Sequence, residues 1–306
     1  MRYCTCCTAQ SFSDSTWRAA YDELHRGLRI PPLPPGETPL PAMIDFYWKH
    51  LWKDNAQSIG KRFCQPDNLR ETHKIWEYVQ MLAMVREALG SLDNARLLSL
   101  GAGVESPLYA FARLGAAVVA TDRYWSRRYW HREYVPYLKT DSNVFNPYDS
   151  AVRPIAFVNL NLRFRSPRDW LTWARLGRFD AVYSISSLEH VYGTNRRSSR
   201  ATDKGIMRRK SALFRRISHR IRPGGALCFT TEVITQWRKR RRLDFYTVDE
   251  LERIIDTLRQ CGLSLVEPVD WETLHEQQLP THRVDGQYHT AVALAFRKEP
   301  GATAET

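Results

Sequence analysis

The chain contains 306 residues, of which 43% are hydrophobic and 12% aromatic, enough to bury a substantial core in one large domain or two smaller ones. No run of about 18 apolar residues is present, so we expect no membrane-spanning helix, and the first residues lack the apolar segment of a signal peptide. Together with six scattered cysteines, these features predict a cytoplasmic protein in a reducing environment. The net charge of +12 makes anionic partners worth considering.

Residues 1–94 predict a helical extension that could act as a lid. Cys4 and Cys7 form a Cys-x-x-Cys pair, but no second pair with matching spacing follows, so we expect a frayed, thiol-bearing terminus and no metal site. Dense prolines at 30–41 predict an extended linker or a strap on the surface. Apolar side chains at helical spacing then predict an amphipathic helix at 70–90: Ile75, Val79, Leu82, Val85 and Leu89.

From residue 96 onward, predicted strands and helices alternate. Strands are expected at 96–100, 116–122, 154–159, 180–186, 226–233, 263–267 and 290–297. Helices are expected at 106–114, 126–138, 167–176, 205–221 and 247–261. This alternation indicates an α/β domain over 95–298, with a mostly parallel sheet, helices on both faces and a disordered tail at 299–306.

A glycine turn follows the first of these strands. Gly101-Ala102-Gly103 comes directly after it, and a helix start follows, with Ser106 as its cap and Pro107 in its first turn. The second strand ends at Asp122, 19 residues beyond Gly103. A nucleoside-binding βαβ unit needs this arrangement. The glycines let the backbone approach the ligand, and a carboxylate at the second strand's tip accepts hydrogen bonds from ribose hydroxyls.

The residues after the glycines discriminate between nucleoside cofactors. A dinucleotide-binding turn requires a third glycine beside the pyrophosphate, whereas this chain has Glu105-Ser106-Pro107. Glu105 would place a carboxylate where a diphosphate should lie. A cofactor without phosphate but with a cationic end fits better, and S-adenosylmethionine, with a sulfonium and an ammonium, is such a cofactor.

Three segments resemble the class I S-adenosylmethionine-dependent methyltransferases. Residues 98–122 resemble their first two motifs, 179–191 their fourth-strand motif, and 221–227 the Pro-Gly-Gly turn before their fifth strand. The resemblance implies a Rossmann-like, seven-stranded sheet whose last strand is antiparallel. It also implies cofactor contacts from Gly101, Ala102, Gly103, Glu105, Asp122, Arg123, Asn161, Ser184 and Ser186. The third-strand motif departs from the family, because Asn161 stands where an acidic residue commonly flanks the adenine.

The acceptor of the methyl group should lie beyond the fourth and fifth strands, where ligands bind in open α/β sheets. His190 could remove a proton from a hydroxyl acceptor, or it could only order the loop. Glu232 could be a base, an acceptor ligand or half of an ion pair. His282 and His289 either reach the acceptor or are solvated loop histidines. We take His190 and Glu232 as the catalytic candidates.

Basic residues are clustered. Eleven Lys or Arg residues and one acid, Asp203, lie between Gly193 and Pro223, and Arg238–Arg242 adds five more. A third basic group and several aromatics follow the second strand at 123–137. The charges either meet phosphate groups or form a solubilising helix face, and the aromatics either stack on an acceptor or pack on the N-terminal region.

Residues 186–190, 229–233, 245–251 and 265–271 further resemble bacterial methyltransferases found with glycan and secondary-metabolite biosynthesis. This resemblance implies a methyltransferase that O-methylates a sugar-containing or other polar or anionic small molecule or glycan in biosynthesis. One alternative is an RNA methyltransferase that uses the arginine clusters, although no RNA-binding module is recognisable. The second is a non-catalytic protein that uses a cofactor fold to bind a partner. The intact Gly101, Gly103 and Asp122 argue against this last alternative.

Overall fold

The computed structural model describes residues 5–7, 14–26, 72–103, 105–124, 146, 148, 150, 152–193, 197–198, 202–237, 240–276, 282–284 and 287–301. The predicted helix at 126–138, the proline-rich segment, the aromatics after Tyr124 and most of the C-terminal tail lie outside these residues. No helix among the described residues is long and apolar enough to span a membrane.

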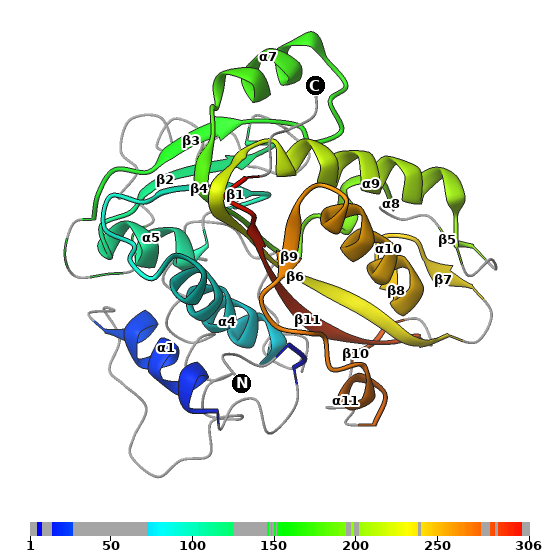
Figure 1. The fold of residues 1–306 in the computed structure, drawn as a ribbon. Helices are drawn as coiled ribbons and strands as arrows, with labels where there is room; N and C mark the ends of the chain where they lie inside the picture. The colour runs from blue at the N-terminus through cyan, green and yellow to red at the C-terminus, as the bar shows by residue number, and fades with distance from the viewer. Residues whose placement is uncertain are drawn as a thin grey trace.

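The elements follow one another along the chain as shown in Figure 1. The helices are α1 (Ser15–His25), α4 (Thr72–Leu89), α5 (Ser106–Arg113), α7 (Pro167–Arg175), α8 (His190–Gly193), α9 (Lys204–Ser218), α10 (Val248–Arg259) and α11 (Trp271–Glu276). The strands are β1 (Arg96–Leu100), β2 (Ala117–Asp122), β3 (Ala156–Asn159), β4 (Phe179–Ile185), β5 (Arg197–Ser198), β6 (Ile221–Trp237), β7 (Arg241–Arg242), β8 (Tyr246–Thr247), β9 (Leu263–Leu265), β10 (His282–Val284) and β11 (Gln287–Lys298).

The main sheet has nine strands in the order β10-β11-β6-β4-β1-β2-β3, with β8 paired to β6 and β9 to β11. All seven predicted strands are present, and the short β8 and β10 extend the sheet. β1, β2, β3, β4 and β6 pair in parallel, whereas β11 is antiparallel to both β6 and β9. The Rossmann-like α/β fold and the antiparallel last strand are therefore confirmed.

Alternating side chains divide the core between the two faces of the sheet. In β11, Ala291, Ala293 and Ala295 belong to the cluster with α1, α4 and α5, whereas Val292, Leu294 and Phe296 belong to the cluster with α9 and α10. Successive strand residues point to opposite faces, which produces this division. Helices α4 and α9 accordingly lie on opposite sides of the sheet in Figure 1. Small alanines allow α4 to pack closely on β11.

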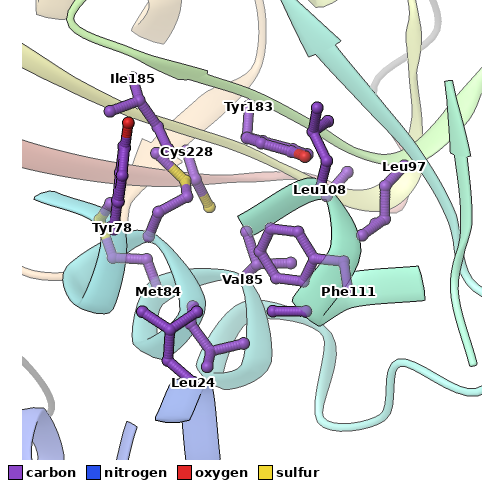
Figure 2. Close-up of a cluster of buried hydrophobic side chains, with 14 of the residues drawn as sticks. Leu24, Tyr78, Met84, Val85, Leu97, Leu108, Phe111, Tyr183, Ile185 and Cys228 are labelled. Atoms are coloured by element: carbon purple, nitrogen blue, oxygen red, sulfur yellow. The ribbon is translucent and has the colours of Figure 1, made fainter. Parts of the chain in front are cut away.

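Helix α4 is present as predicted, but its expected amphipathic character is wrong. Every residue from Trp76 to Met84 is buried, including the polar Glu77 and Gln80. The sheet covers one side of α4, and α1 packs on another, so almost no face is left to solvent. Figure 2 shows Tyr78, Met84 and Val85 of α4 among side chains from α1, α5 and the strands.

The N-terminal cysteines correct a second expectation. Cys6 and Cys7 are 4% and 2% exposed, so this segment is not a frayed terminus. Cys7 N donates to Ala291 O at 3.0 Å, and Ala293 N donates to Thr5 O at 2.8 Å. Residues 5–7 thereby pair with the outer edge of β11 between β9 and β10. They satisfy backbone groups that an open sheet edge would expose.

Two local predictions also need correction. The cap of α5 is Glu105 rather than Ser106, which is the first helical residue. The Pro-Gly-Gly turn lies inside β6, where the pairing with β4 shifts register between Phe179 and Ala181. A Cβ on Gly225 would lie 2.6 Å from Asp180 O, so this irregularity depends on the close approach of two backbones.

Candidate cofactor and acceptor site

The chain order of the strands reverses at β1. From β1 the chain proceeds through β2 to β3 at one edge, and β4 then returns to pair with the other side of β1. Loops at the carboxyl ends of β1 and β4 diverge at such a switch point, which creates the crevice where open α/β sheets bind ligands. The predicted site residues Gly101–Gly103, Asp122 and Ser186 come from the loops and strand ends on this side of the sheet. Glu232 instead lies within β6, which continues past the end of its pairing with β4 at Thr230, so the expected position of Glu232 at the tip of the fifth strand is wrong.

The glycine loop is held in place by its own hydrogen bonds. Gly103 N donates to Asp122 Oδ2 at 3.0 Å, Ala102 N donates to Thr121 O at 3.0 Å, and Tyr124 Oη donates to Gly103 O at 2.7 Å. Gly101 and Gly103 have φ values of +67° and +51°, in the region that favours glycine. The Asp122 carboxylate also accepts from Arg123 N, so the backbone of Arg123 lies at the site.

Gly101 is required by a neighbour as well as by its φ angle. A Cβ at this position would lie 1.8 Å from Ser187 Oγ, in the loop after β4. The two loops that follow β1 and β4 are therefore packed against each other. The loop of the predicted first motif can lie this close to the loop of the fourth-strand motif only because Gly101 has no side chain.

Ser186 has a strained backbone at the end of β4. Its φ is +41°, which is uncommon for serine and is often found where a site holds the chain in a special conformation. Ser186 N donates to Thr230 O at 3.1 Å, and Ser186 Oγ donates to Glu77 Oε1. Ser184 is different, because it is fully buried and donates to Leu100 O at 2.9 Å. Its hydroxyl joins β4 to β1.

Asn161 lies just beyond β3. Its Oδ1 accepts from Arg163 N at 3.1 Å, and its backbone N donates to Asp169 Oδ1 at 3.2 Å. The side-chain oxygen of Asn161 thus accepts a hydrogen bond within the turn that follows β3. The amide NH2 is the group of Asn161 that could contact an adenine ring.

A cluster of carboxylates lies beside the glycine loop. Lys74 Nζ of α4 is 2.9 Å from Glu77 Oε2. Burial, together with Glu77 and Asp122, raises the pKa of Glu105 to about 8, against the opposing influence of Lys74 and a hydrogen bond from Tyr78. Burial lowers the pKa of Lys74, but Glu77, Glu105 and Glu189 outweigh it and hold that pKa above its ordinary value.

Glu189 connects this cluster to the acceptor side. Its side chain is fully buried, and neither carboxylate oxygen bonds to another of the described residues. Burial raises the pKa of Glu189 to about 7, and Glu232 and Glu77 reinforce the shift against the attraction of His190. A buried carboxylate without a partner is costly, so Glu189 suits a ligand that brings positive charge or a hydrogen-bond donor.

His190 is paired with a residue that sequence analysis did not identify. His190 Nδ1 lies 3.5 Å from Asp244 Oδ2, and Arg242 binds the same carboxylate through two nitrogens. Burial lowers the pKa of His190, but Asp244, Glu189 and Glu232 raise it by more, so the net shift is upward. A Cβ on Gly193 would lie 1.9 Å from Leu243 O, so this glycine lets α8 approach the Asp244 loop.

A second histidine–carboxylate pair lies nearby. His289 Nδ1 is 3.6 Å from Glu232 Oε2, so Glu232 pairs with a histidine, one of its three expected roles. The expectation of a solvated loop histidine is wrong for His289, which lies in β11 and is 4% exposed. Phe245 separates the two pairs. Its ring stacks on His289 at 4.8 Å and meets His190 edge-on at 5.6 Å.

Part of the basic cluster serves the fold. Arg241 is fully buried in an ion pair with Glu250, and Arg242 holds Asp244. Lys210 is also buried and donates to Leu243 O at 3.3 Å. Neither expectation for this basic run, phosphate contact or a solubilising face, holds for the fully buried Arg241. Exposed arginines remain along α9 and α7: Arg208, Arg209, Arg215, Arg168 and Arg175.

Lys74, Glu77 and Asp244 belong to the candidate site but were not predicted from the sequence. A signal existed for Glu77, since it is a carboxylate among the apolar residues of the helix predicted at 70–90. Such a residue needs a partner or a function. No local signal marks Asp244, because its pairing with His190 depends on how the chain returns after β6.

The charged side chains of the site indicate which kind of cofactor it can hold. Asp122 supplies a carboxylate for hydroxyl donors, and the nearby carboxylates of Glu77, Glu105 and Glu189 favour positive charge. These residues fit a ligand with a hydroxylated part and a cationic part, and they would repel a diphosphate.

A scan against protein-family models finds no match, and a search of curated proteins also finds none. Among solved structures, the chain is similar to magnesium protoporphyrin IX methyltransferase from Synechocystis PCC 6803, with a TM-score of 0.45 and 13% identity, covering 84% of this chain and 95% of that one. It is also similar to N-methyltransferase NodS from Bradyrhizobium japonicum WM9, with a TM-score of 0.43 and 13% identity, covering 93% and 99%.

Proposed function

We propose that this protein is an S-adenosylmethionine-dependent methyltransferase. The observation that carries the proposal is the Asp122 carboxylate bonded to Gly103 N at the carboxyl ends of β1 and β2, beside a buried carboxylate cluster. Asp122 would hold the ribose hydroxyls, and Glu105 would face the amino-acid end. When bound, this cofactor supplies a methyl group on a positively charged sulfur, which is already a good leaving group.

The acceptor side supports O-methylation. A hydroxyl acceptor has a high pKa and needs a base as the new bond forms. His190 can take that proton at Nε2, because Asp244 lies against Nδ1 and would stabilise the imidazolium. Glu232 and His289 would orient further polar groups of the acceptor. We therefore propose a sugar-containing or other polar small molecule or glycan as acceptor.

Calorimetry with S-adenosylmethionine and S-adenosylhomocysteine tests the cofactor assignment. We expect both to bind the wild-type chain, and Asp122→Ala to weaken both. Absence of binding to the wild-type chain would overturn the proposal and support the non-catalytic alternative. Transfer of a radiolabelled methyl group to hydroxyl-rich acceptors would then test the acceptor class, with His190→Ala as the variant expected to lose activity.

One observation favours RNA as a second candidate acceptor. Trp170 on α7 is 45% exposed, and the Arg216 guanidinium lies 4.8 Å from its ring, beside the exposed arginines of α9. Exposed aromatics among arginines can stack on bases and contact phosphates. Filter binding with single-stranded RNA discriminates an RNA acceptor from a small-molecule or glycan acceptor. If the arginines contact RNA phosphates, RNA should bind tightly, and its affinity should fall steeply as the salt concentration rises.

A further inference from the structure

Helix α4 contributes two opposite charges to the site. Lys74 and Glu77 lie one turn apart in the first half of α4, with Nζ and Oε2 2.9 Å apart. The Glu77 side chain is fully buried, whereas that of Lys74 is 32% exposed. Glu77 Oε1 also accepts from the hydroxyl of Ser186, the strained residue that follows β4. This helix therefore touches the loop that packs against Gly101.

Burial of this ion pair costs free energy, because a buried charge loses its hydration. The Glu77 carboxylate loses its water and the Lys74 ammonium loses part of its own, and their mutual attraction repays this cost only when further groups complete the arrangement. Glu77 lies in the same electrostatic neighbourhood as Glu105 and Glu189, so the pair adds an ammonium to a site that otherwise holds carboxylates. A small ligand that carries a carboxylate and an ammonium side by side could exchange partners with both residues, and no charge would lose its counterion.

We propose that Lys74 and Glu77 recognise the amino-acid end of the methyl donor, with Lys74 binding its α-carboxylate and Glu77 binding its α-ammonium. This inference rests on the proposed function and deepens it. Helix α4 then belongs to the donor site as well as to the core. Lys74 makes the site selective for a donor that retains its carboxylate.

The test compares two ligands that differ in one group. S-adenosylmethionine has the α-carboxylate, and decarboxylated S-adenosylmethionine keeps the sulfonium and the amine without it. By calorimetry, we expect the wild-type chain to prefer the first ligand by about 10-fold or more, as a charge-assisted contact should. In Lys74→Met, S-adenosylmethionine should lose most of this advantage, while the affinity for the decarboxylated ligand changes little.

Arg86→Met is the matched control, because it removes a positive charge from an exposed position on the same helix. It should leave both affinities unchanged. Lys74→Arg keeps the charge and should retain the preference. Lys74→Met leaves Glu77 without its counterion, so the double variant Lys74→Met/Glu77→Gln, which removes both charges, provides the same comparison if the single variant does not fold.

Three results would overturn the inference. A wild-type chain that binds both ligands equally would show that the carboxylate is not recognised. An unchanged preference in Lys74→Met, or an equal loss for both ligands, would show that Lys74 does not contact the carboxylate. In each case binding of S-adenosylmethionine by the wild-type chain still supports the proposed function. A wild-type chain that binds neither ligand would overturn both proposals.

Discussion

Asp122 Oδ2 accepts a hydrogen bond of 3.0 Å from Gly103 N, which joins the tip of β2 to the glycine loop after β1. The acid therefore stabilises the loop in addition to its proposed contact with ribose. Asp122→Ala should weaken S-adenosylhomocysteine binding by roughly 1–3 kcal/mol, the usual cost of losing a charged hydrogen-bond acceptor. Calorimetry measures this change. Asp256→Ala on the exposed face of α10 is the control, and an equal effect in both variants would contradict the assignment.

The close approach of Gly101 to Ser187 predicts a large effect on stability. Gly101→Ala combines a φ of +67° with a Cβ 1.8 Å from Ser187 Oγ, whereas Gly90→Ala has a φ of +74° and no atom within 4 Å. We expect the Gly90 variant to lose about 1 kcal/mol from backbone strain, and the Gly101 variant roughly 1–3 kcal/mol more.

Denaturant unfolding of both variants measures the difference. Adding Ser187→Gly to Gly101→Ala removes the clashing atoms and should recover part of the loss. Equal destabilisation at the two glycines would show that the loops after β1 and β4 are not packed together as described.

The raised carboxyl pKa values predict that ligand binding depends on pH. With pKa values of about 7 for Glu189 and about 8 for Glu105, both groups are largely protonated at pH 6 and ionised above pH 8. A ligand with an ammonium prefers the ionised forms. The affinity for S-adenosylhomocysteine should therefore rise from pH 6 to pH 8.5, as measured by calorimetry, and Glu105→Gln should flatten the upper part of the rise. An affinity independent of pH would contradict this electrostatic picture.

The same shifts predict the opposite trend for the stability of the chain without ligand. A glutamate whose folded pKa is raised from its ordinary 4.5 binds its proton more tightly when folded. Its stabilising contribution is complete below about pH 4.5 and is lost as pH rises through about 7 for Glu189 and about 8 for Glu105. The contribution of these groups to the free energy of unfolding should fall between pH 5 and 8.5. Double replacement by glutamine should reduce that fall in urea titrations.

His190 should titrate at a higher pH than an isolated histidine, because Asp244, Glu189 and Glu232 outweigh the effect of burial. Asp244→Asn removes a major cause of the shift and should lower the pKa of His190. NMR titration of the histidine ring resonances measures this without knowledge of the acceptor. Asp256→Asn is the control. If His190 titrates identically in wild type and Asp244→Asn, the pair does not form in solution.

The βαβ unit could be predicted because its determinants are local. The glycines after β1 and the acid at the end of β2 each act within a few residues or across one crossover connection. The resemblance of three motifs to the class I methyltransferases further predicted the antiparallel last strand and the general location of the site. Boundaries shifted by a few residues where pairing extended a strand, as in β6 and β11.

The sequence by itself determined the strand pattern, the glycine turn after β1 and the acid at the end of β2, since steric limits on φ and the period of a strand are properties of neighbouring residues. Only the tertiary structure decided that Thr5–Cys7 covers the edge of β11, that Glu77 of α4 reaches Ser186, and that Asp244 faces His190. Each of these contacts joins residues more than 50 positions apart in the chain. Their formation depends on which sheet edge is open, which helix face is covered and where the chain returns, and these are properties of the packed molecule.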